Sequence, residues 1–343
     1  MVLTVALLVL HAAPLEVRVL ERERPTTLTL SATALSCDGV ALPSPQQLVL
    51  RGGAVHAGAK SCTAVNATGD VTVRLAKWSR QFPGEVRVTA QGATLRLLNV
   101  VDVEDYLPSV IEAEADGFPP AALQAQAVVS RTFALTAKRH RDFGLCDLAH
   151  CQVYRGVTAN EAARDAVRKT TGQFLHTAEG APLPAYFHAS CGGHTSTPRD
   201  VFGEASVGTG VADPSCAAHT WSFSAPRAKW AAAFKVPAHG PALEVVRRDA
   251  GGRALEVRVF GKKLTGDSFL SLAGRAFGWR AVRSARFTAT ESRGAVSLSG
   301  SGTGHGVGFC QLGAKDLANR GANARDILQH YFPEVQLDAM GQE

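Results

Sequence analysis

Hydrophobic and polar residues alternate through the first part of the chain. From Pro14 to about residue 104, segments such as LEVRVLE, TTLTLSA and VTVRLAKW carry an apolar side chain at every second position, with Gly, Pro, Asn and Asp between segments. A period of two residues is typical of β-strands with one buried face. The pattern predicts a β-rich region over residues 14–96.

A helical period follows, and one carboxylate falls on its apolar side. Asp105 is expected to cap a helix over residues 106–115, with Pro108 tolerated in its first turn. The apolar stripe of this helix consists of Leu107, Val110 and Ile111. Glu114 continues the stripe, whereas Glu112 lies on the opposite side of the helix. A carboxylate on a buried face needs a partner, a raised pKa or a function.

Helices and strands then alternate to the end of the chain. A second helix is predicted from Pro120 to about His140, and a third over residues 158–172 with Thr158 or Asn160 near its cap. The section at about 225–275 has strand-like alternation and is interpreted as an insertion, and a further helix is expected near 313–320. This order predicts an α+β fold with a mixed core over residues 97–343.

Composition and charge restrict the class of protein. The 343 residues are 45% hydrophobic and 19% charged, which predicts a folded protein of one large or two modest domains. The net charge is +6, but Arg and Lys are scattered, so we expect no nucleic acid as partner. No apolar run reaches the roughly 18 residues of a transmembrane anchor. Residues 1–13 form a short apolar run ending in small residues and Pro14, which predicts a signal peptide and export; an incomplete start or a buried first strand is the alternative.

Seven cysteines are more than a cytosolic chain of this size usually carries, and they favour an oxidising compartment. We expect disulfides between Cys37 and Cys62 and between Cys191 and Cys216. Of the three remaining cysteines, Cys146 and Cys151 lie close together in the sequence, and Cys310 is the odd one.

Four nitrogen and sulfur ligands fall within the segment HRDFGLCDLAHCQVY. They are His140, Cys146, His150 and Cys151. Four such ligands suit tetrahedral zinc. The spacing does not match a common zinc finger, and a local disulfide between Cys146 and Cys151 is an equal alternative.

Two segments, HASCGGHTS (188–196) and GTGHGVGFCQLG (302–313), combine glycine with histidine. Glycines allow a chain to approach a ligand closely, and His and Thr can hydrogen-bond a hydroxyl-rich substrate. A nucleophilic Cys191 or Cys310, activated by a histidine, is a sharper alternative. A disulfide cysteine and a packed thiol are the favoured interpretation.

Glu114 suits a lytic reaction on a sugar chain. As a general acid it would need an apolar, partly buried setting that raises its pKa. One carboxylic acid can protonate a glycosidic oxygen and then, as carboxylate, take a proton from the C6 hydroxyl of the sugar, which closes an anhydro ring without water. The plain alternative is a helix-end residue paired with Arg131.

Four ordered segments carry a family resemblance. EDYLPSVIEAEADGFPPAALQAQAVVSRTFAL, CDLAHCQVYRGV, YFHASCGGHTS with DVFG, and GHGVGFCQLGAKDLANRGANARDIL resemble the SpoIID/LytB family of bacterial cell-wall proteins, from about Leu97 to Leu337. The resemblance implies a lytic transglycosylase that cleaves peptide-stripped glycan strands of peptidoglycan, with Glu114 as catalytic acid. The implied groove residues are Gln126, Arg131, His188, Ser190, Gly192, Gly193, Thr195, His305 and Gln311.

The resemblance also has departures and alternatives. Gln124 replaces the usual lysine and Ala115 the usual methionine, which leaves a reduced or altered activity open. Zinc on the 140–151 segment, found in some members of the family, would be structural, because four protein ligands leave no position for water. The alternative function is a non-catalytic peptidoglycan binder that stimulates a cell-wall amidase.

Overall fold

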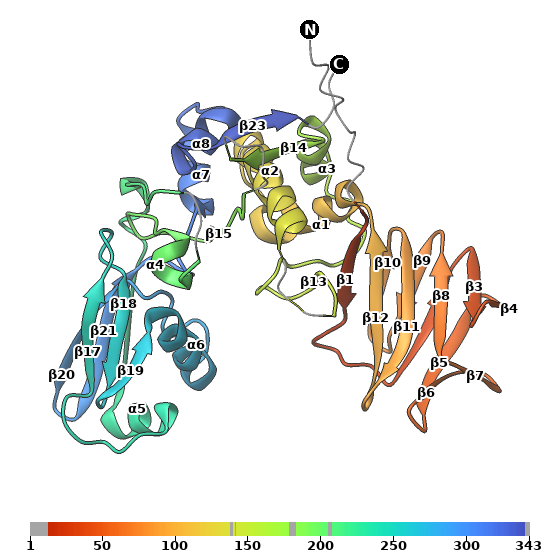
Figure 1. Ribbon diagram of the computed structural model, residues 1–343, viewed down its shortest axis with the longest axis horizontal. Helices are drawn as coiled ribbons and strands as arrows, with labels where there is room; N and C mark the ends of the chain where they lie inside the picture. Colours follow the sequence, from red (N-terminus) through yellow and green to blue (C-terminus); the bar gives the residue numbers. More distant parts are fainter. Residues whose placement is uncertain (1–12, 138–139, 141, 178–182, 205–207, 340–343) are drawn as a thin grey trace, which may run out of the picture. The chain divides into compact units, whose positions relative to one another are not determined.

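The computed structural model describes residues 13–137, 140, 142–177, 183–204 and 208–339 (Figure 1). The predicted signal peptide, except for Ala13, lies outside these residues. The chain forms two compact units, unit 1 with Met1–Phe174 and Leu337–Glu343 and unit 2 with Leu175–Gln336. The boundary expected at 96/97 from composition falls inside unit 1. Both units combine helices with sheets, which confirms the predicted α+β class.

The alternating N-terminal segments form two sheets in unit 1. A seven-stranded sheet has the order β13-β1-β12-β11-β8-β3-β4, and a six-stranded sheet has the order β10-β9-β2-β5-β6-β7. In β12, buried and more exposed side chains alternate along the whole strand, as the two-residue period predicts. The first sheet consists of β1 (Leu15–Val19), β3 (Ala34–Cys37), β4 (Val40–Leu42), β8 (Ala64–Thr68), β11 (Glu85–Gln91), β12 (Thr94–Val101) and β13 (Leu145–Cys146). The second consists of β2 (Thr27–Ser31), β5 (Gln46–Arg51), β6 (Ala54–Ala57), β7 (Lys60–Cys62), β9 (Val71–Arg74) and β10 (Ser79–Phe82).

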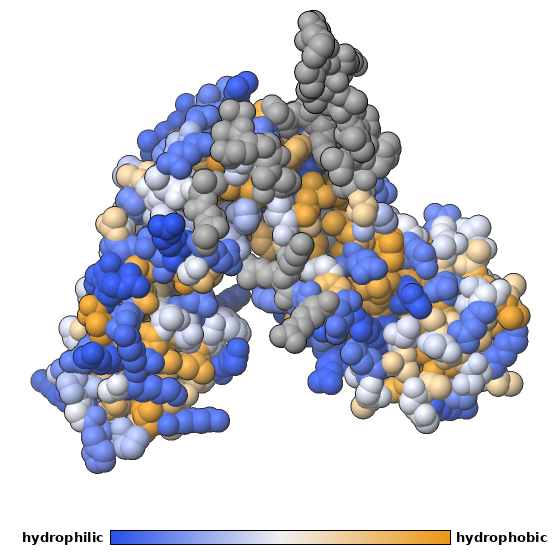
Figure 2. All heavy atoms as spheres, in the orientation of Figure 1, coloured by the Kyte–Doolittle hydropathy of each residue, from blue (hydrophilic) through white to orange (hydrophobic). Residues whose placement is uncertain are grey.

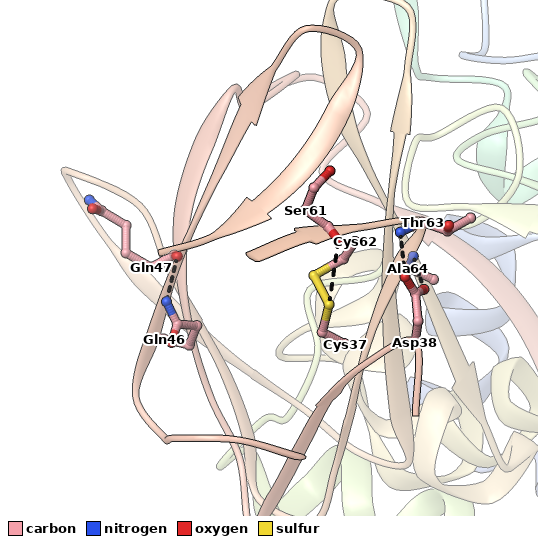
Figure 3. Close-up of a disulfide and its surroundings, with 8 residues drawn as sticks. All are labelled: Cys37, Asp38, Gln46, Gln47, Ser61, Cys62, Thr63 and Ala64. Carbon is pink, nitrogen blue, oxygen red and sulfur yellow. Dashed lines mark hydrogen bonds between the residues drawn. A yellow bond between two sulfur atoms is a disulfide. The ribbon is translucent and has the colours of Figure 1, made fainter. Parts of the chain in front are cut away.

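A disulfide connects these two sheets. It joins Cys37 at the end of β3 to Cys62 at the end of β7, so this predicted pair is confirmed. Beside it, Figure 3 shows Asp38, whose carboxylate accepts hydrogen bonds from the backbone amides of Thr63 and Ala64, each at 2.9 Å. These two bonds lower the pKa of Asp38. The end of β3 is therefore held to β7 by a covalent bond and to the start of β8 by an ionised side chain.

Helix α1 (Val103–Ala115) begins three residues before its predicted start. The N-cap is Asp102, whose carboxylate accepts a hydrogen bond from the amide of Glu104 at 2.8 Å, so the prediction of Asp105 as cap was wrong. Asp105 lies in the first turn instead, and Pro108 lies in the second turn rather than the first. Two aspartates precede the apolar stripe, and sequence alone does not decide which one caps.

Two further helices of unit 1 pack against α1 and each other. Helix α2 (Pro120–Thr136) begins at the predicted proline but ends four residues before His140, where Ala137 turns extended. Helix α3 (Glu161–Lys169) is capped by Asn160, one of the two predicted caps, which accepts from the amide of Ala163 at 3.0 Å.

Unit 2 is built around an aromatic core. Two three-stranded sheets, in the orders β16-β21-β20 and β17-β18-β19, pack with two helices around residues such as Trp230, Phe234 and Phe269. The elements are β16 (Thr220–Pro226), α5 (Arg227–Phe234), β17 (Leu243–Arg248), β18 (Ala254–Val259), β19 (Lys262–Thr265), α6 (Gly266–Phe277), β20 (Phe287–Ser292) and β21 (Ala295–Ser301). The prediction of strands alone for 225–275 missed α5 and α6. Figure 2 shows hydrophilic residues over much of the visible face of these strands, at the lower left.

The remaining elements of unit 2 are short. Strand β15 (Phe187–His188) pairs in parallel with β22 (Phe309–Cys310), and thereby brings the two glycine- and histidine-rich segments together. Around them lie α4 (Pro198–Phe202), the 3₁₀ helix η1 (Pro214–Cys216), α7 (Gln311–Asn319) and α8 (Ala324–Tyr331). Helix α7 confirms the helix predicted near 313–320. A separate sheet pairs β14 (Gln173–His176) with β23 (Gln336–Ala339). Among the helices of the described ranges, none is long and apolar enough to cross a membrane.

Candidate functional site

Glu114 lies in the last turn of α1, on the predicted stripe. Leu107, Val110 and Ile111 on this stripe are fully buried, and Glu114 at its end is half-buried. Its Oε1 atom accepts a hydrogen bond from the backbone amide of Val153 at 3.2 Å. The carboxylate is therefore held at a defined place in unit 1 by a loop that lies far from it in sequence.

The loop that holds Glu114 is itself fixed along α1. The hydroxyl of Tyr106 donates to Oε1 of Gln152 at 3.1 Å, and the amide of Arg155 donates to the hydroxyl of Ser109 at 2.9 Å. Burial, followed by the negative charges of neighbouring groups including Glu114, raises the pKa of Tyr106, so Tyr106 remains a donor. Three contacts thus align residues 152–155 with one face of α1.

Arg131 is an internal residue. Its side chain is fully buried, and Nε and Nη2 donate to the two carboxylate oxygens of Glu104, both at 2.7 Å. Nη1 also donates to the carbonyl of Gln173 at 3.0 Å. The ion pair suggested between Arg131 and Glu114 is therefore wrong, since α1 presents Glu104 to Arg131 instead. The implied groove role of Arg131 is also not supported in this conformation.

Gln126, a further implied groove residue, is buried within α2. Its Nε2 atom donates to the hydroxyl of Ser130 at 3.0 Å, and its Oε1 atom is a buried acceptor without a partner among the described residues. Gln126 is therefore a packed residue of α2, whereas Gln124, which replaces the family's lysine, is half-buried.

His140, Cys146, His150 and Cys151 come together in unit 1, and we call them the histidine–cysteine cluster. One ligand atom from each lies within 4.8 Å of all the others. The two sulfurs are 3.7 Å apart, His140 Nε2 is 3.4 Å from Cys151 Sγ, and His150 Nδ1 is 3.2 Å from Cys146 Sγ. Tetrahedral zinc with its usual bond lengths separates two sulfurs by about 3.8 Å and a sulfur from a nitrogen by about 3.5 Å. The donor set and its spacing fit zinc.

Both cysteines of this cluster are free thiols in the structure. Their separation of 3.7 Å is well beyond a disulfide bond of about 2.05 Å. A hydrogen bond from the Cys146 thiol lowers the pKa of Cys151 to about 5, and His140 and His150 act in the same direction. Cys151 is therefore a thiolate at neutral pH, the form that binds metals.

In unit 2, the two glycine- and histidine-rich segments pack against each other, backbone to backbone. The amide of Ser190 donates to the carbonyl of Thr303 at 3.1 Å, and the reverse bond is 2.8 Å. A Cβ at Gly192 would lie 2.7 Å from the carbonyl carbon of Ser301, and one at Gly302 would lie 2.7 Å from the carbonyl oxygen of Ser190. These glycines allow the backbones of the two segments to approach each other closely.

His188 is a neutral, buried residue at this contact. It is 4% exposed, and its Nδ1 donates to the carbonyl of Val307 at 3.1 Å. Burial first, and then the nearby His305 and Arg253, lower the pKa of His188 well below its usual value. With Nδ1 protonated, Nε2 is an acceptor, and it has no partner among the described residues.

The other implied groove residues of unit 2 differ in exposure. Ser190, Thr195 and Gln311 are buried, and the Thr195 hydroxyl accepts from the amide of Val211 at 2.8 Å. His305 is half-buried; its Nδ1 accepts from the amide of Val307 at 3.0 Å, and its ring lies 5.5 Å from that of His188. Among the implied groove residues of unit 2, His305 and Gly193 are half-buried and the others are buried.

The two cysteines of these segments are not accessible nucleophiles. Cys191 and Cys310 are both 0% exposed. Cys191 and Cys216 are free thiols, so the expected disulfide between them is wrong. Sequence alone does not place Cys191, Cys216 and Cys310 relative to one another, because they belong to three separate segments.

Arg253 connects the two segments and was not identified from sequence. Its Nη2 donates to the carbonyl of Cys191 at 3.2 Å, Nη1 to that of Gly304 at 3.3 Å and Nε to the hydroxyl of Ser196 at 3.0 Å. Burial lowers the pKa of Arg253 to about 10, so it keeps its charge at neutral pH. A single arginine before an alternating segment gives no sequence signal of this role.

An open groove of about 890 Å³ also lies in unit 2. Trp221, Arg248 and Arg286 are among its lining residues. The two guanidinium groups donate to backbone carbonyls, for example Arg248 Nη2 to Phe287 at 2.9 Å and Arg286 Nε to Gly251 at 2.7 Å. An aromatic ring beside two cations is a candidate surface for an anionic or hydroxyl-rich ligand.

Comparison with known proteins agrees with the resemblance seen in the sequence. The profile of the family described as SpoIID, stage II sporulation protein, matches residues 91–176, which include Glu114 and the histidine–cysteine cluster. Stage II sporulation protein D of Bacillus amyloliquefaciens is 27% identical over 268 residues, 69% of this chain and 74% of that protein. An uncharacterised protein of Brachyspira hyodysenteriae is 28% identical over 270 residues, 75% of this chain and 72% of that protein. The amidase enhancer of Bacillus subtilis is 25% identical over 270 residues, 63% of this chain but 38% of that protein.

Proposed function

Because the chain belongs to the SpoIID/LytB family, we propose that it is a lytic transglycosylase that cleaves peptide-stripped glycan strands of peptidoglycan. The family and the names of the relatives fit a role at the cell wall. The observation that carries the proposal is the position of Glu114, a half-buried carboxylate at the end of an apolar stripe, held by the amide of Val153.

The reaction requires one carboxyl group in two roles. As an acid, Glu114 gives its proton to the glycosidic oxygen while the bond from that oxygen to the anomeric carbon breaks. As a base, the Glu114 carboxylate then takes the proton of the C6 hydroxyl on the same sugar. The C6 oxygen bonds to the anomeric carbon, which closes the anhydro ring. The carboxyl regains its proton and no water is consumed.

The glycine- and histidine-rich segments of unit 2 are the proposed sugar-binding residues. His305 is half-buried, and His188, Ser190, Thr195 and Gln311 are buried. Glu114 belongs to unit 1, and these segments belong to unit 2.

We assign the histidine–cysteine cluster to structural zinc. Four protein ligands close the coordination sphere, so the ion would have no open position for a water nucleophile. Bound zinc would fix the 140–151 loop, and Gln152 and Val153 follow directly after its last ligand. The residues of this loop would thereby orient the amide that holds Glu114.

The deciding experiment compares Glu114→Gln with Glu112→Gln. Both glutamates lie in the last turns of α1 and both are half-buried, but only Glu114 is on the stripe. Purified wild type and Glu112→Gln should release anhydro-muramyl products from peptide-free glycan, and Glu114→Gln should release almost none. Equal product from wild type and Glu114→Gln would refute the mechanism.

A second function is favoured by one relative, which is named an amidase enhancer. In this case the chain would bind peptidoglycan without turnover and stimulate a cell-wall amidase. Ala115 and Gln124, which depart from the family's usual residues beside the acid, are compatible with this alternative. Amidase stimulation that survives Glu114→Gln, with no anhydro product from wild type, would favour it.

We also propose that the protein is exported to the cell envelope or beyond. The disulfide between Cys37 and Cys62 supports an oxidising compartment. An epitope-tagged chain should be found outside the cytoplasm, and loss of residues 1–13 should retain it inside.

A further inference from the structure

A second cluster of potential metal ligands lies in unit 2. It consists of Cys191, Asp213, Cys216 and Cys310, and we call it the three-cysteine cluster. One ligand atom from each lies within 4.8 Å of all the others. Every member is at most 3% exposed. The ligands come from three segments. Cys191 follows β15, Asp213 precedes η1 and Cys216 is its last residue, and Cys310 ends β22.

The sulfurs of this cluster are close but not bonded. Cys216 Sγ is 3.3 Å from Cys310 Sγ, which exceeds a disulfide bond of about 2.05 Å. Cys191 Sγ is 3.4 Å from Asp213 Oδ2. A tetrahedral zinc ion separates a sulfur from a carboxylate oxygen by about 3.5 Å and two sulfurs by about 3.8 Å. The spacing therefore suits a single ion at the centre of four ligands.

The surrounding groups favour anionic ligands. The amide of Gly193 donates to Cys191 Sγ at 3.3 Å, and the amide of Cys191 donates to Cys310 Sγ at 3.2 Å. Such backbone bonds to sulfur stabilise a thiolate.

Asp213 has outer contacts of the kind that orient a metal-binding carboxylate. The hydroxyl of Tyr331 donates to Oδ2 at 2.8 Å, and the hydroxyl of Ser215 donates to Oδ1 at 2.6 Å. A Cβ at Gly313 would lie 2.0 Å from Asp213 Oδ2, so a glycine is required where α7 passes the carboxylate. Within the described residues Asp213 forms no ion pair with Lys, Arg or His. A buried carboxylate without a cation is costly, and an ion would supply the missing positive charge.

We propose that Cys191, Asp213, Cys216 and Cys310 bind a structural zinc ion, distinct from the ion of the histidine–cysteine cluster. On binding, the thiols lose their protons to solvent and three thiolates and one carboxylate surround the zinc. Arg253, which donates to the carbonyl of Cys191, partly offsets the negative charge that remains.

The position of this ion indicates what it would do. The described residues 189–204 and 208–217 contain little regular structure beyond α4 and η1, whereas Cys310 directly precedes α7. An ion bound by Cys191, Asp213 and Cys216 on one side and by Cys310 on the other would hold this loop against β22 and α7. It would thereby fix the backbone contact between the segments that carry His188 and His305.

Zinc content in a variant without the first cluster tests the inference. The full-length Cys146→Ser/Cys151→Ser variant, purified without chelators, should retain one zinc per chain by elemental analysis. The further change Cys310→Ala should remove that zinc. As a matched control, Cys37→Ser/Cys62→Ser in the same background should leave the zinc content unchanged, because those cysteines form a disulfide.

Spectroscopy gives a second measurement on folded protein. In the Cys146→Ser/Cys151→Ser background, cobalt(II) should produce thiolate-to-cobalt absorption with the visible bands of a tetrahedral site, and Asp213→Asn should shift those bands. If the Cys146→Ser/Cys151→Ser variant retained no zinc and showed no such cobalt bands, the proposal would be overturned. A native Cys216–Cys310 disulfide in peptide mapping without reductant would also overturn it.

Discussion

Oε1 of Glu114 and the backbone amide of Val153 form a hydrogen bond of 3.2 Å. Val153 lies two residues after Cys151, the last ligand of the histidine–cysteine cluster. Residues 152–155 are also bound to α1 through Tyr106 and Ser109. The proposed catalytic acid and the proposed zinc are thus connected by one short, well-fixed stretch of backbone. Because of this connection, loss of the metal should change the activity that depends on Glu114.

Loss of the metal ligands in unit 1 should therefore reduce activity through the position of Glu114. Cys146→Ser/Cys151→Ser should lower the rate of anhydro-muramyl product formation about 10–100-fold, the usual cost of disturbing groups that position a site. The circular dichroism spectrum should stay close to that of wild type. Full activity together with loss of zinc from the histidine–cysteine cluster would show that the loop does not position the acid.

The buried ion pair between Arg131 and Glu104 should matter for stability. Glu104→Gln leaves the fully buried guanidinium with a weaker partner and should lower the free energy of unfolding by about 2–3 kcal/mol. Glu161→Gln is the matched control, because Glu161 is 82% exposed and pairs with Arg164 on the surface of α3. That change should cost less than about 0.5 kcal/mol in urea-induced unfolding. Equal effects of the two variants would contradict the structural role of Arg131.

The close approach of the two glycine-rich segments predicts a difference between two glycines with similar backbone. Gly302 has φ +81° with backbone atoms of Ser190 and Gly192 within 2.8 Å of a Cβ, whereas Gly294 has φ +75° with nothing within 4 Å. In both alanine variants the free energy of unfolding should fall by about 1 kcal/mol, because alanine is strained in the left-handed conformation. In Gly302→Ala the free energy of unfolding should fall by about 2 kcal/mol more, because the new Cβ clashes with the backbone of Ser190 and Gly192. Thermal unfolding of both variants measures this, and equal losses would rule out a tight contact.

His188 should make the stability of unit 2 depend on pH. Its folded-state pKa lies well below 6.5, so below about pH 6.5 the unfolded chain binds more protons and stability falls as the pH falls. The stabilisation that neutral His188 contributes is fully present above the pKa of histidine in the unfolded chain, and it decreases as the pH falls below that value. His188→Asn removes it, so its destabilisation should be smaller at pH 5 than at pH 7 by up to about 2 kcal/mol. Urea unfolding followed by tryptophan fluorescence tests this, since Trp230 lies in the core of unit 2. If His188→Asn lowered the free energy of unfolding equally at pH 5 and pH 7, His188 would not be held neutral in the folded protein.

Local sequence patterns predicted the local structure of this protein well. The two-residue period marked the N-terminal strands, and the stripe of Leu107, Val110 and Ile111 correctly indicated the buried face that ends at Glu114. Element ends were less accurate, as at Asp102, because two aspartates three residues apart, Asp102 and Asp105, could each act as a cap. The helices α5 and α6 were missed within a segment read as strands.

The sequence by itself determined the strands, the helical stripe, the set of cysteines and histidines in 140–151 and the family resemblance, since each depends on residues near one another along the chain. Only the tertiary structure decided which groups meet across long separations. It paired Arg131 with Glu104, set Val153 against Glu114, and brought Asp213 to three cysteines from separate segments. Such contacts follow from how whole elements pack, because burial forces each polar group to find a partner wherever the fold provides one.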